Sequence, residues 1–391
     1  MYMARASIVG AGMTNFAVHD TTLQELFAEA AFEAMDDAGI QNGEIDAMYF
    51  GNAMGGMTEH DIHLSPTMAA HLGLSGIPCQ RFEDACATSS NAFKHAVEAV
   101  KSGRHDVVLA GGVERCSQST DIDTPGMTHI FDSVVHKQTE QPAGMTAPGF
   151  FALLTKRHMY EHGTTQEHLA EIAVKNHYHG SLNPRAHFTD EITTDDVLDS
   201  PMVADPFHLY DCCPFSDGAS AVLVTSEEQS DSFVGNTVNV AGVGHATDTV
   251  PIADNPTPHT TRAARRAAEQ AYDQAGIRPD DVDFAEVHDC FTGEEVMAIE
   301  ALKLVEDGEG GKAAANGELY ISGEYPINPS GGLKAKGHPL GATGTAQLVE
   351  LTDHLRGEAG ERQVEDATIG VAHNLGGDAS TTVVSVLEAG T

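Results

Sequence analysis

The pattern of apolar and polar positions divides the chain into short apolar stretches, typical of buried strands, and longer stretches with helical spacing. A unit of strand, helix and strand occurs twice, at residues 6–12, 23–40 and 44–55 and again at residues 238–246, 261–277 and 281–291. In both copies the helical stretch ends in Ala-Gly-Ile, and Gly39 and Gly276 stand where a helix-ending glycine is expected. The pattern therefore predicts an internal duplication.

A second unit is repeated in the same way: a helix with small residues near its N-terminus, followed by an apolar strand that ends in glycines. It lies at residues 86–103 and 106–114, and again at residues 341–357 and 366–377. Continuous apolar strands joined by helices are typical of buried sheets that helices cover. We therefore predict an α/β protein built from two duplicated halves.

The segment from Cys116 to Pro214 breaks this pattern, because it is richer in His, Pro and Thr. We interpret it as a large insertion or cap. The predicted division is residues 1–115 for the first part of the N-terminal half, 116–214 for the insertion, 215–235 for the last strand of that half and a linker, and 236–391 for the C-terminal half.

The chain of 391 residues is strongly acidic, with 58 Asp and Glu against 21 Lys and Arg and a formal net charge of −37. This charge argues against a protein that coats nucleic acid or binds an anionic membrane. It also destabilises the compact state by self-repulsion unless salt screens it. We therefore expect a protein adapted to molar salt, as in extreme halophiles; an ordinary acidic protein is the alternative.

Targeting signals are not evident in the sequence. The N-terminal stretch lacks the charged and apolar regions of a signal peptide, and no apolar run reaches the roughly 18 residues of a membrane span. The six Cys are irregularly spaced and do not resemble a disulfide framework. We expect a cytoplasmic protein with reduced thiols.

Cys86, in the stretch EDACATSS, directly precedes a predicted helix. Free N–H groups and the dipole at a helix N-terminus favour a thiolate, so we expect a lowered pKa and a reactive sulfur. A small thiol packed in the core is the alternative.

His288 and Cys290 lie two residues apart in EVHDCFTGEE, at the end of an apolar strand. Alternate residues of an extended chain point to the same side, so both are expected to face one pocket. Taken alone, a His-x-Cys pair is also compatible with metal binding.

His338 lies in GGLKAKGHPLGATG, where five glycines predict a backbone that approaches a ligand or another loop closely. In the stretch AHNLGGD, Gly376 and Gly377 offer unobstructed backbone N–H groups to a developing oxyanion.

Together these motifs resemble the thiolase family, and most closely its sterol-carrier-protein-type and archaeal members. The stretches VGAGMTNF, SDGASAVL, HDCF, GHPLGATG and NLGG follow in the family's order along nearly the whole chain. The combination of GHPxGxTG with HDCF is specific, whereas each piece alone is not. The resemblance implies the family's fold, two similar α/β halves in a five-layered α/β/α/β/α arrangement with an inserted loop domain.

The resemblance also implies roles for individual residues. Cys86 would be the nucleophile that takes an acyl group from an acyl-CoA, and His338 would accept its proton and later help to bind the thioester oxygen of the second substrate. His288 stands where other thiolases have an Asn that orients an oxyanion-binding water. No Cys follows Cys290, so the family's C-terminal Cys-x-Gly loop is absent, and Cys290 takes the acid/base role as in the HDCF-bearing branch.

Two oxyanion holes are implied, one formed by His288 and His338 and the other by the N–H groups of Cys86 and of Gly376 or Gly377. Candidate substrate-binding residues are Lys334, Lys336 and Asn374. The two lysines lie in a loop suited to the CoA phosphates, although solvated side chains are the alternative. No metal ligand and no bound cofactor are expected.

The implied activity is that of an acetyl-CoA C-acetyltransferase, which condenses two acetyl-CoA to acetoacetyl-CoA and CoA or runs the reverse thiolysis. Archaeal relatives feed the mevalonate route, and some haloarchaeal ones serve polyhydroxyalkanoate synthesis. Expected partners are a second copy of the chain, as a homodimer or dimer of dimers, and a small zinc-ribbon/OB-fold protein. The alternatives are a thiolase for longer or branched 3-ketoacyl-CoA, a ketosynthase-like or 3-hydroxy-3-methylglutaryl-CoA synthase-like enzyme, and a non-catalytic acyl-CoA-binding scaffold.

Other motifs are discounted. HMYEH at residues 158–162 is interpreted as an exposed helix and KNHYHG at residues 175–180 as a solvated loop, rather than as metal sites. The Gly-x-Gly near the N-terminus lacks the third glycine of a dinucleotide-binding motif. Cys212 and Cys213 are expected to be packing residues.

Overall fold

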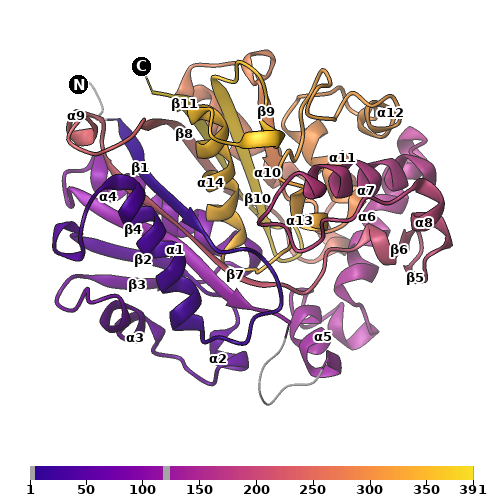
Figure 1. The fold of residues 1–391 in the computed structure, drawn as a ribbon. Helices are drawn as coiled ribbons and strands as arrows, with labels where there is room; N and C mark the ends of the chain where they lie inside the picture. The colour runs from indigo at the N-terminus through magenta and orange to yellow at the C-terminus, as the bar shows by residue number, and fades with distance from the viewer. Residues whose placement is uncertain (1–4, 118–123, 391) are drawn as a thin grey trace.

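The computed structural model describes residues 5–117 and 124–390 of the chain (Figure 1). Within them, nine strands form one sheet in the order β3-β2-β4-β7-β1-β8-β11-β10-β9. The strands are β1 (Ala6–Met13), β2 (Ala47–Gly51), β3 (Cys79–Phe82), β4 (Val107–Arg115), β7 (Asp217–Ser226), β8 (Val238–Thr247), β9 (Phe284–Val287), β10 (Ile369–Gly376) and β11 (Thr381–Ala389). The two halves meet where the start of β1 pairs antiparallel with the start of β8.

The sheet confirms the duplication that the sequence predicts. Outward from the centre, the N-terminal half has the order β1-β7-β4-β2-β3 and the C-terminal half the order β8-β11-β10-β9. In each half the first two pairings are antiparallel and the next is parallel. A single parallel bridge between Ala285 and Ile327 stands where β3 stands in the first half.

The helices form layers around the two parts of the sheet. Helix α1 (Leu23–Ala38) covers the outer face of the N-terminal half and α10 (Arg262–Ala275) that of the C-terminal half, while α4 (Thr88–Lys101) and α14 (Thr343–Arg356) lie between the halves. Three large apolar clusters fill the spaces between these layers, and the middle one unites α4 and α14 with strands of both halves. The layering agrees with the α/β/α/β/α arrangement that the resemblance implies.

Glycines let the outer helices approach the central strands. A Cβ at Gly10 or Gly12 of β1 would fall on the backbone of α1, and a Cβ at Gly242 or Gly244 of β8 would fall on the backbone of α10. The Gly-x-Gly near the N-terminus is therefore a packing device that both halves share. Gly39 and Gly276 end α1 and α10 in the left-handed conformation, with φ of 71° and 73°, as predicted.

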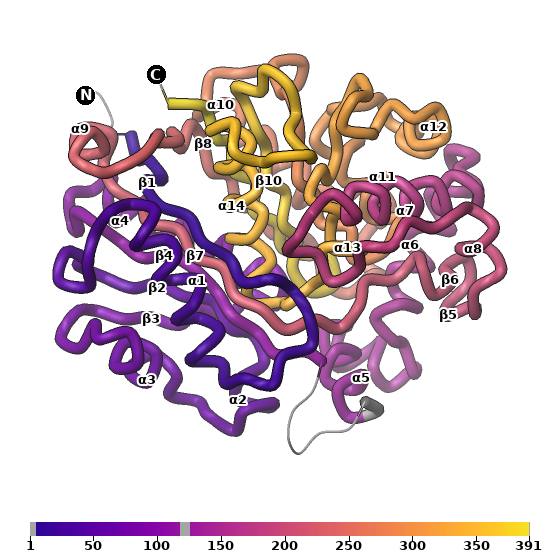
Figure 2. Tube along the Cα trace, in the orientation of Figure 1, coloured from indigo at the N-terminus to yellow at the C-terminus, as the bar shows by residue number. Residues whose placement is uncertain are grey.

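The chain leaves the sheet at the end of β4 and returns at the start of β7. The segment between them contains α5 (Thr124–Asp132), α6 (Ala147–His162), α7 (Gln166–Ser181), α8 (Thr194–Asp199), β5 (Met202–Ala204) and β6 (Phe207–His208). Its residues 118–123 lie outside the described part of the chain. Helices α6 and α7 pack against α11 (Thr292–Ala301) of the C-terminal half, whereas α5 lies apart from them and shares an apolar cluster with Met54 of the N-terminal half (Figure 2). The domain boundaries themselves stay predictions.

Short helices complete the fold. They are α2 (Gly55–Thr58), α3 (Leu64–His71), α9 (Glu227–Ser230), α12 (Gly310–Ala315) and α13 (Gly332–Ala335). No helix in the described residues is both long and apolar enough to cross a membrane.

Two predictions for the inserted segment are wrong. The KNHYHG stretch is not a solvated loop, because it lies inside α7, with His177 and His179 buried. The HMYEH helix exists, but its His158 is buried and not exposed, with Nε2 at 3.0 Å from a carboxylate oxygen of Glu300. His158 and His179 face the C-terminal half, whereas His177 packs within the inserted segment, against the rings of Phe188 and Tyr210.

Candidate active site

Cys86 lies in a single turn of 3₁₀ helix, Ala85–Ala87, that leads directly into α4. The preceding residue, Ala85, has a φ of 47°, a left-handed conformation that costs a non-glycine residue about 1 kcal/mol or more. This tight turn presents the sulfur of the half-buried Cys86 to a cavity. The backbone N–H of Gly377, at the end of β10, points at the same sulfur.

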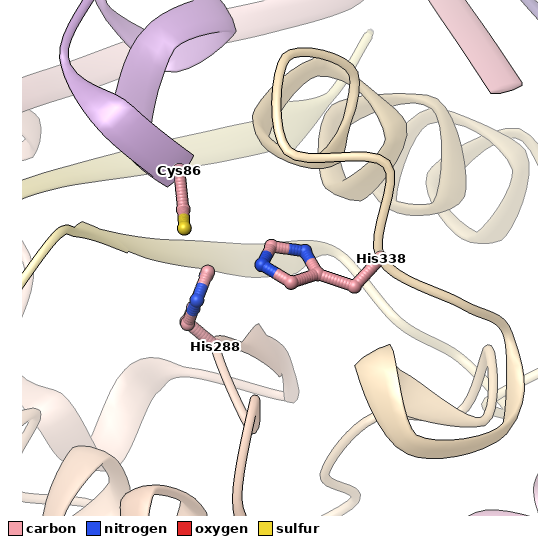
Figure 3. A group of neighbouring side chains, drawn as sticks. All are labelled: Cys86, His288 and His338. Carbon is pink, nitrogen blue, oxygen red and sulfur yellow. The ribbon is translucent and has the colours of Figure 1, made fainter. Parts of the chain in front are cut away.

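Two imidazoles converge on Cys86 (Figure 3). His288 follows β9, and His338 precedes α14. The sulfur of Cys86 and one ring nitrogen of each histidine all lie within 4.8 Å of one another. The two ring centres are 4.9 Å apart and the rings are nearly perpendicular, at 86°. The structure thus brings together three residues that are far apart in the sequence.

His338 is held by the helix that follows it. Its Nδ1 lies 2.7 Å from the hydroxyl oxygen of Thr343, and that hydroxyl donates to the carbonyl oxygen of Pro339 at 2.9 Å. Thr343 belongs to the GHPLGATG motif, but its role was not foreseen in the sequence analysis.

His288 is held by Asn374, on β10. The amide nitrogen of Asn374 lies 2.9 Å from His288 Nδ1, and the Asn374 carbonyl oxygen accepts from the Ser90 hydroxyl at 2.9 Å. The prediction that Asn374 binds substrate is therefore corrected: both ends of its amide are occupied by protein partners, and its side chain is buried.

Burial decides the charge state of these groups. It raises the pKa of the Cys86 thiol to about 12, against the favourable N–H group of Gly377, and it lowers the pKa of His338 to about 3. Burial, together with the two neighbouring histidines, also lowers the pKa of His288 well below its usual value. The expected lowering of the Cys86 pKa is therefore wrong, and the site holds a neutral thiol and two neutral imidazoles.

The cavity in front of Cys86 has a volume of about 420 Å³ and a largely apolar wall. Its apolar side chains include Phe131, Val134, Phe151, Leu209, Phe215, Phe291 and Leu340. Cys290 lines the cavity together with His288, as the two-residue spacing predicts, and burial raises the pKa of Cys290 well above its usual value. Cys212 and Cys213 also line it, and they pack against the apolar cluster of the C-terminal half, as expected.

The two glycines of the AHNLGGD stretch have different roles. Gly377 lines the cavity and has a φ of 62°, which favours glycine. Gly376 is the last residue of β10 and packs against the backbone of Asp84, so the N–H group that faces Cys86 is that of Gly377.

Lys334 and Lys336 are not placed to bind CoA phosphates. Each is only 1% exposed. The ammonium group of Lys334 donates to the Cys212 carbonyl, and that of Lys336 lies 3.5 Å from a carboxylate oxygen of Glu286. The prediction failed because a loop position in the sequence does not reveal that a lysine side chain turns into the protein.

The glycines around His338 serve close contact between loops, as the sequence predicts. A Cβ at Gly344 would lie 2.7 Å from the side-chain oxygen of Asn374 and still closer to the hydroxyl oxygen of Ser90. A Cβ at Gly341 would lie 2.6 Å from the carbonyl oxygen of Val113. The His338 loop therefore fits directly onto the N-terminal half.

Two buried carboxylates that the sequence analysis missed anchor the loops. Glu114 accepts from the backbone N–H of Ala53 at 2.7 Å and also from that of Gly341, three residues after His338. Asp289, next to His288, accepts from Leu333 N–H at 2.7 Å and from the Asn176 amide at 2.8 Å. Of these two residues, only Asp289 could have been singled out from the sequence, because it belongs to the HDCF motif.

The arrangement supports two kinds of chemistry. A thiol beside a neutral imidazole, with N–H groups nearby, suits nucleophilic acyl transfer. Cys86, His288 and His338 are also donors that zinc accepts, and they form the one such group in the described part of the chain. Comparison with known proteins shows which family has this fold.

Two family models match the chain. Residues 6–228 match "Thiolase, N-terminal domain" and residues 244–389 match "Thiolase C-terminal domain-like". The chain is 42% identical over 385 residues to the acetyl-CoA acetyltransferase of Methanothermobacter thermautotrophicus, covering 98% of this chain and 99% of that protein. It is 36% identical to bovine sterol carrier protein 2, covering 95% of this chain and 70% of that protein.

Solved structures show the same fold. Human mitochondrial 3-ketoacyl-CoA thiolase in complex with CoA superposes with a TM-score of 0.76 at 17% identity, covering 100% of this chain and 99% of that one. A structure titled Ltp2-ChsH2(DUF35) aldolase gives a TM-score of 0.84 at 24% identity, covering 98% of both chains.

Proposed function

The chain belongs to the thiolase family, and on this premise we propose that it is an acetyl-CoA C-acetyltransferase, which condenses two acetyl-CoA to acetoacetyl-CoA and CoA and runs the reverse thiolysis. The observation that carries the proposal is the convergence of Cys86, His288 and His338 in a cavity that Cys290 also lines. The relatives named acetyl-CoA acetyltransferase support the choice of substrate.

The first half-reaction makes an acetyl-enzyme. As the Cys86 sulfur attacks the thioester carbonyl of acetyl-CoA, its proton passes to His338, so the neutral pair reacts without a free thiolate at rest. The negative charge that develops on the carbonyl oxygen is received by the N–H groups of Cys86 and Gly377. When the tetrahedral intermediate collapses, the CoA sulfur leaves and takes a proton from Cys290, which becomes a thiolate.

The second half-reaction forms the carbon–carbon bond. The Cys290 thiolate removes a proton from the methyl group of a second acetyl-CoA, and His288 donates a hydrogen bond to the enolate oxygen. The enolate carbon attacks the acetyl carbonyl on Cys86. Collapse releases acetoacetyl-CoA, and the Cys86 sulfur regains the proton held on His338. Both cysteines and both histidines end neutral, as they began.

The cavity favours a second candidate substrate. A largely apolar space of about 420 Å³ can take an acyl chain longer than acetoacetyl, and relatives named sterol carrier protein 2 lie at 36% identity. This alternative is a degradative thiolase for longer or branched 3-ketoacyl-CoA. A non-catalytic acyl-CoA-binding scaffold is disfavoured, since Cys86, His288, His338 and Cys290 all retain chemically active side chains.

Thiolysis tests the proposal. Purified protein in molar KCl is mixed with CoA and acetoacetyl-CoA or a longer 3-ketoacyl-CoA, and loss of the enolate absorbance is followed. Rapid turnover of acetoacetyl-CoA supports the acetyltransferase, and turnover of longer chains alone supports the degradative alternative.

We also propose a small partner protein, in line with the complex named in one structural title. An activity that needs such a protein would support this part.

A further inference from the structure

The two histidines that face Cys86 have different partners at Nδ1. Each ring is buried, and each Nδ1 lies within 3 Å of one side-chain group, an amide for His288 and a hydroxyl for His338. A neutral imidazole carries one proton, so the partner at Nδ1 decides whether Nε2 is a donor or an acceptor. Both pKa values are lowered by burial, so the neutral forms are the ones to consider.

At His338 the chain of hydrogen bonds places the proton on Nδ1. The Thr343 hydroxyl has a single hydrogen, and it donates that hydrogen to the Pro339 carbonyl, which can only accept. The hydroxyl oxygen is then the acceptor for His338 Nδ1, 2.7 Å away. Nε2 of His338 is left without a proton and is free to act as a base.

At His288 the chain of hydrogen bonds places the proton on Nε2. The Ser90 hydroxyl donates to the carbonyl oxygen of Asn374, so the NH₂ group of that amide faces His288. The NH₂ group can only donate, and His288 Nδ1, 2.9 Å away, is therefore the acceptor. Nε2 of His288 carries the proton, and this buried atom has no hydrogen-bond partner among residues 5–117 and 124–390.

We propose that Thr343 and Asn374 are positioning residues that hold the two imidazoles in opposite tautomers, so that His338 presents a base to Cys86 and His288 presents an N–H donor to the substrate oxygen. This inference rests on the proposed acyl-transfer function. If both rings shared one tautomer, the site would hold either two bases and no imidazole donor or two donors and no base for the thiol. Ser90 acts on His288 through Asn374, and it belongs to α4 of the opposite half.

The fold fixes this arrangement tightly. Asn374 is 1% exposed and Thr343 is 2% exposed, so water does not compete for either hydrogen bond. Gly344, next to Thr343, brings α14 against both Ser90 and Asn374. The hydrogen-bonding groups of the two histidines are therefore parts of one contact between the halves.

The first test needs no activity. Nitrogen NMR of protein labelled in its histidines distinguishes protonated from bare ring nitrogens, and the His288 and His338 signals are assigned by their loss in His288→Gln and His338→Gln. We expect a protonated Nε2 on His288 and a protonated Nδ1 on His338. The same tautomer on both rings in the wild-type protein would overturn the inference, even if the protein were a working thiolase.

The second test uses a matched pair at Thr343. Thr343→Ser keeps the hydroxyl, and Thr343→Val keeps the shape without it. We expect Thr343→Val to slow acetylation of Cys86 by about 10- to 100-fold with little change in KM, and Thr343→Ser to stay within about threefold of wild type. Equal loss in the two variants, with both folded by circular dichroism, would contradict a role for the hydroxyl.

The third test reverses the contact at Asn374. Asn374→Asp replaces a donor by an acceptor, which draws a proton onto His288 Nδ1 and raises the pKa of His288. We expect the rate of condensation in this variant to depend on pH near neutrality, which the wild-type rate does not. On the alkaline side the His288 ring is neutral and its Nε2 carries no proton, so the rate is expected to fall by about 100-fold. An unchanged pH profile would overturn the assignment. Wild-type protein without thiolysis would instead contradict the proposed function, while the NMR result would still decide the tautomers.

Discussion

Cys86 and His338 face each other from opposite halves of the protein: Cys86 lies in the turn before the inner helix α4, and His338 lies in the loop before the inner helix α14. The two helices pack against each other between the sheets. Duplication therefore brings the N-terminal ends of two related helices to the same point, where one half supplies the nucleophile and the other supplies the base. The site depends on the contact between the halves and cannot form in either half alone.

The charge state of Cys86 is open to direct measurement. Burial raises the pKa of this thiol to about 12, so the thiolate fraction grows about tenfold per pH unit throughout the neutral range. We expect the rate of alkylation of Cys86 by iodoacetamide, followed by peptide mass spectrometry, to rise with pH up to about 9 without levelling off. A plateau between about pH 6 and 8 would indicate a low-pKa thiolate and contradict this account.

Loss of Cys290 is expected to separate the two half-reactions. In Cys290→Ala we predict that Cys86 still becomes acetylated by a reactive acetyl ester, while condensation and thiolysis fall by at least about 100-fold, because the methyl proton has no acceptor. Cys79→Ser, in the edge strand β3, is the matched control, since it alters a thiol outside the cavity. Equal loss of acetylation and condensation in Cys290→Ala would assign this thiol a different role.

Gly344 tests the contact between the halves. Because a Cβ there would press on Ser90 and Asn374, Gly344→Ala is expected to lower the free energy of unfolding by about 1–3 kcal/mol and to reduce activity. Gly43→Ala is the control, since a Cβ at that position meets nothing within 4 Å. Denaturant unfolding measures both variants, and equal stability of the two would show that the contact is looser than described.

The net charge of −37 predicts dependence on salt. Screening reduces the repulsion among surface carboxylates, so the melting temperature is expected to rise from about 0.1 M to molar KCl. Sucrose at matched osmolality controls for the general stabilisation that excluded solutes cause. A melting temperature that does not change with KCl would contradict adaptation to salt.

Sequence pattern alone predicts the repeated units, because each half buries the same apolar strands and ends its outer helix with the same glycine. That Cys86, His288, Cys290 and His338 serve one site follows from the resemblance to thiolases and not from the pattern. It could not predict the raised pKa of Cys86, which depends on how deeply the folded halves enclose the sulfur.

The directions in which side chains point could not be predicted from the sequence either. Lys334 and Lys336 stand in the loop where substrate phosphates were expected, but the fold turns both side chains inward. Asn374 contacts Ser90, 284 positions away, and no local pattern reveals such a partner. Residues that position the catalytic groups thus came from the structure, whereas the reactive groups came from the sequence.

The central claim, that Cys86 carries the acyl group, is tested most directly by trapping the intermediate. Protein is incubated with acetyl-CoA, quenched in acid, digested and analysed by mass spectrometry. The account predicts one acetyl group on the peptide that contains Cys86, its removal on addition of CoA, and its absence in Cys86→Ala. Acetylation of another residue in the wild type, or turnover of acetoacetyl-CoA by Cys86→Ala at the wild-type rate, would contradict it.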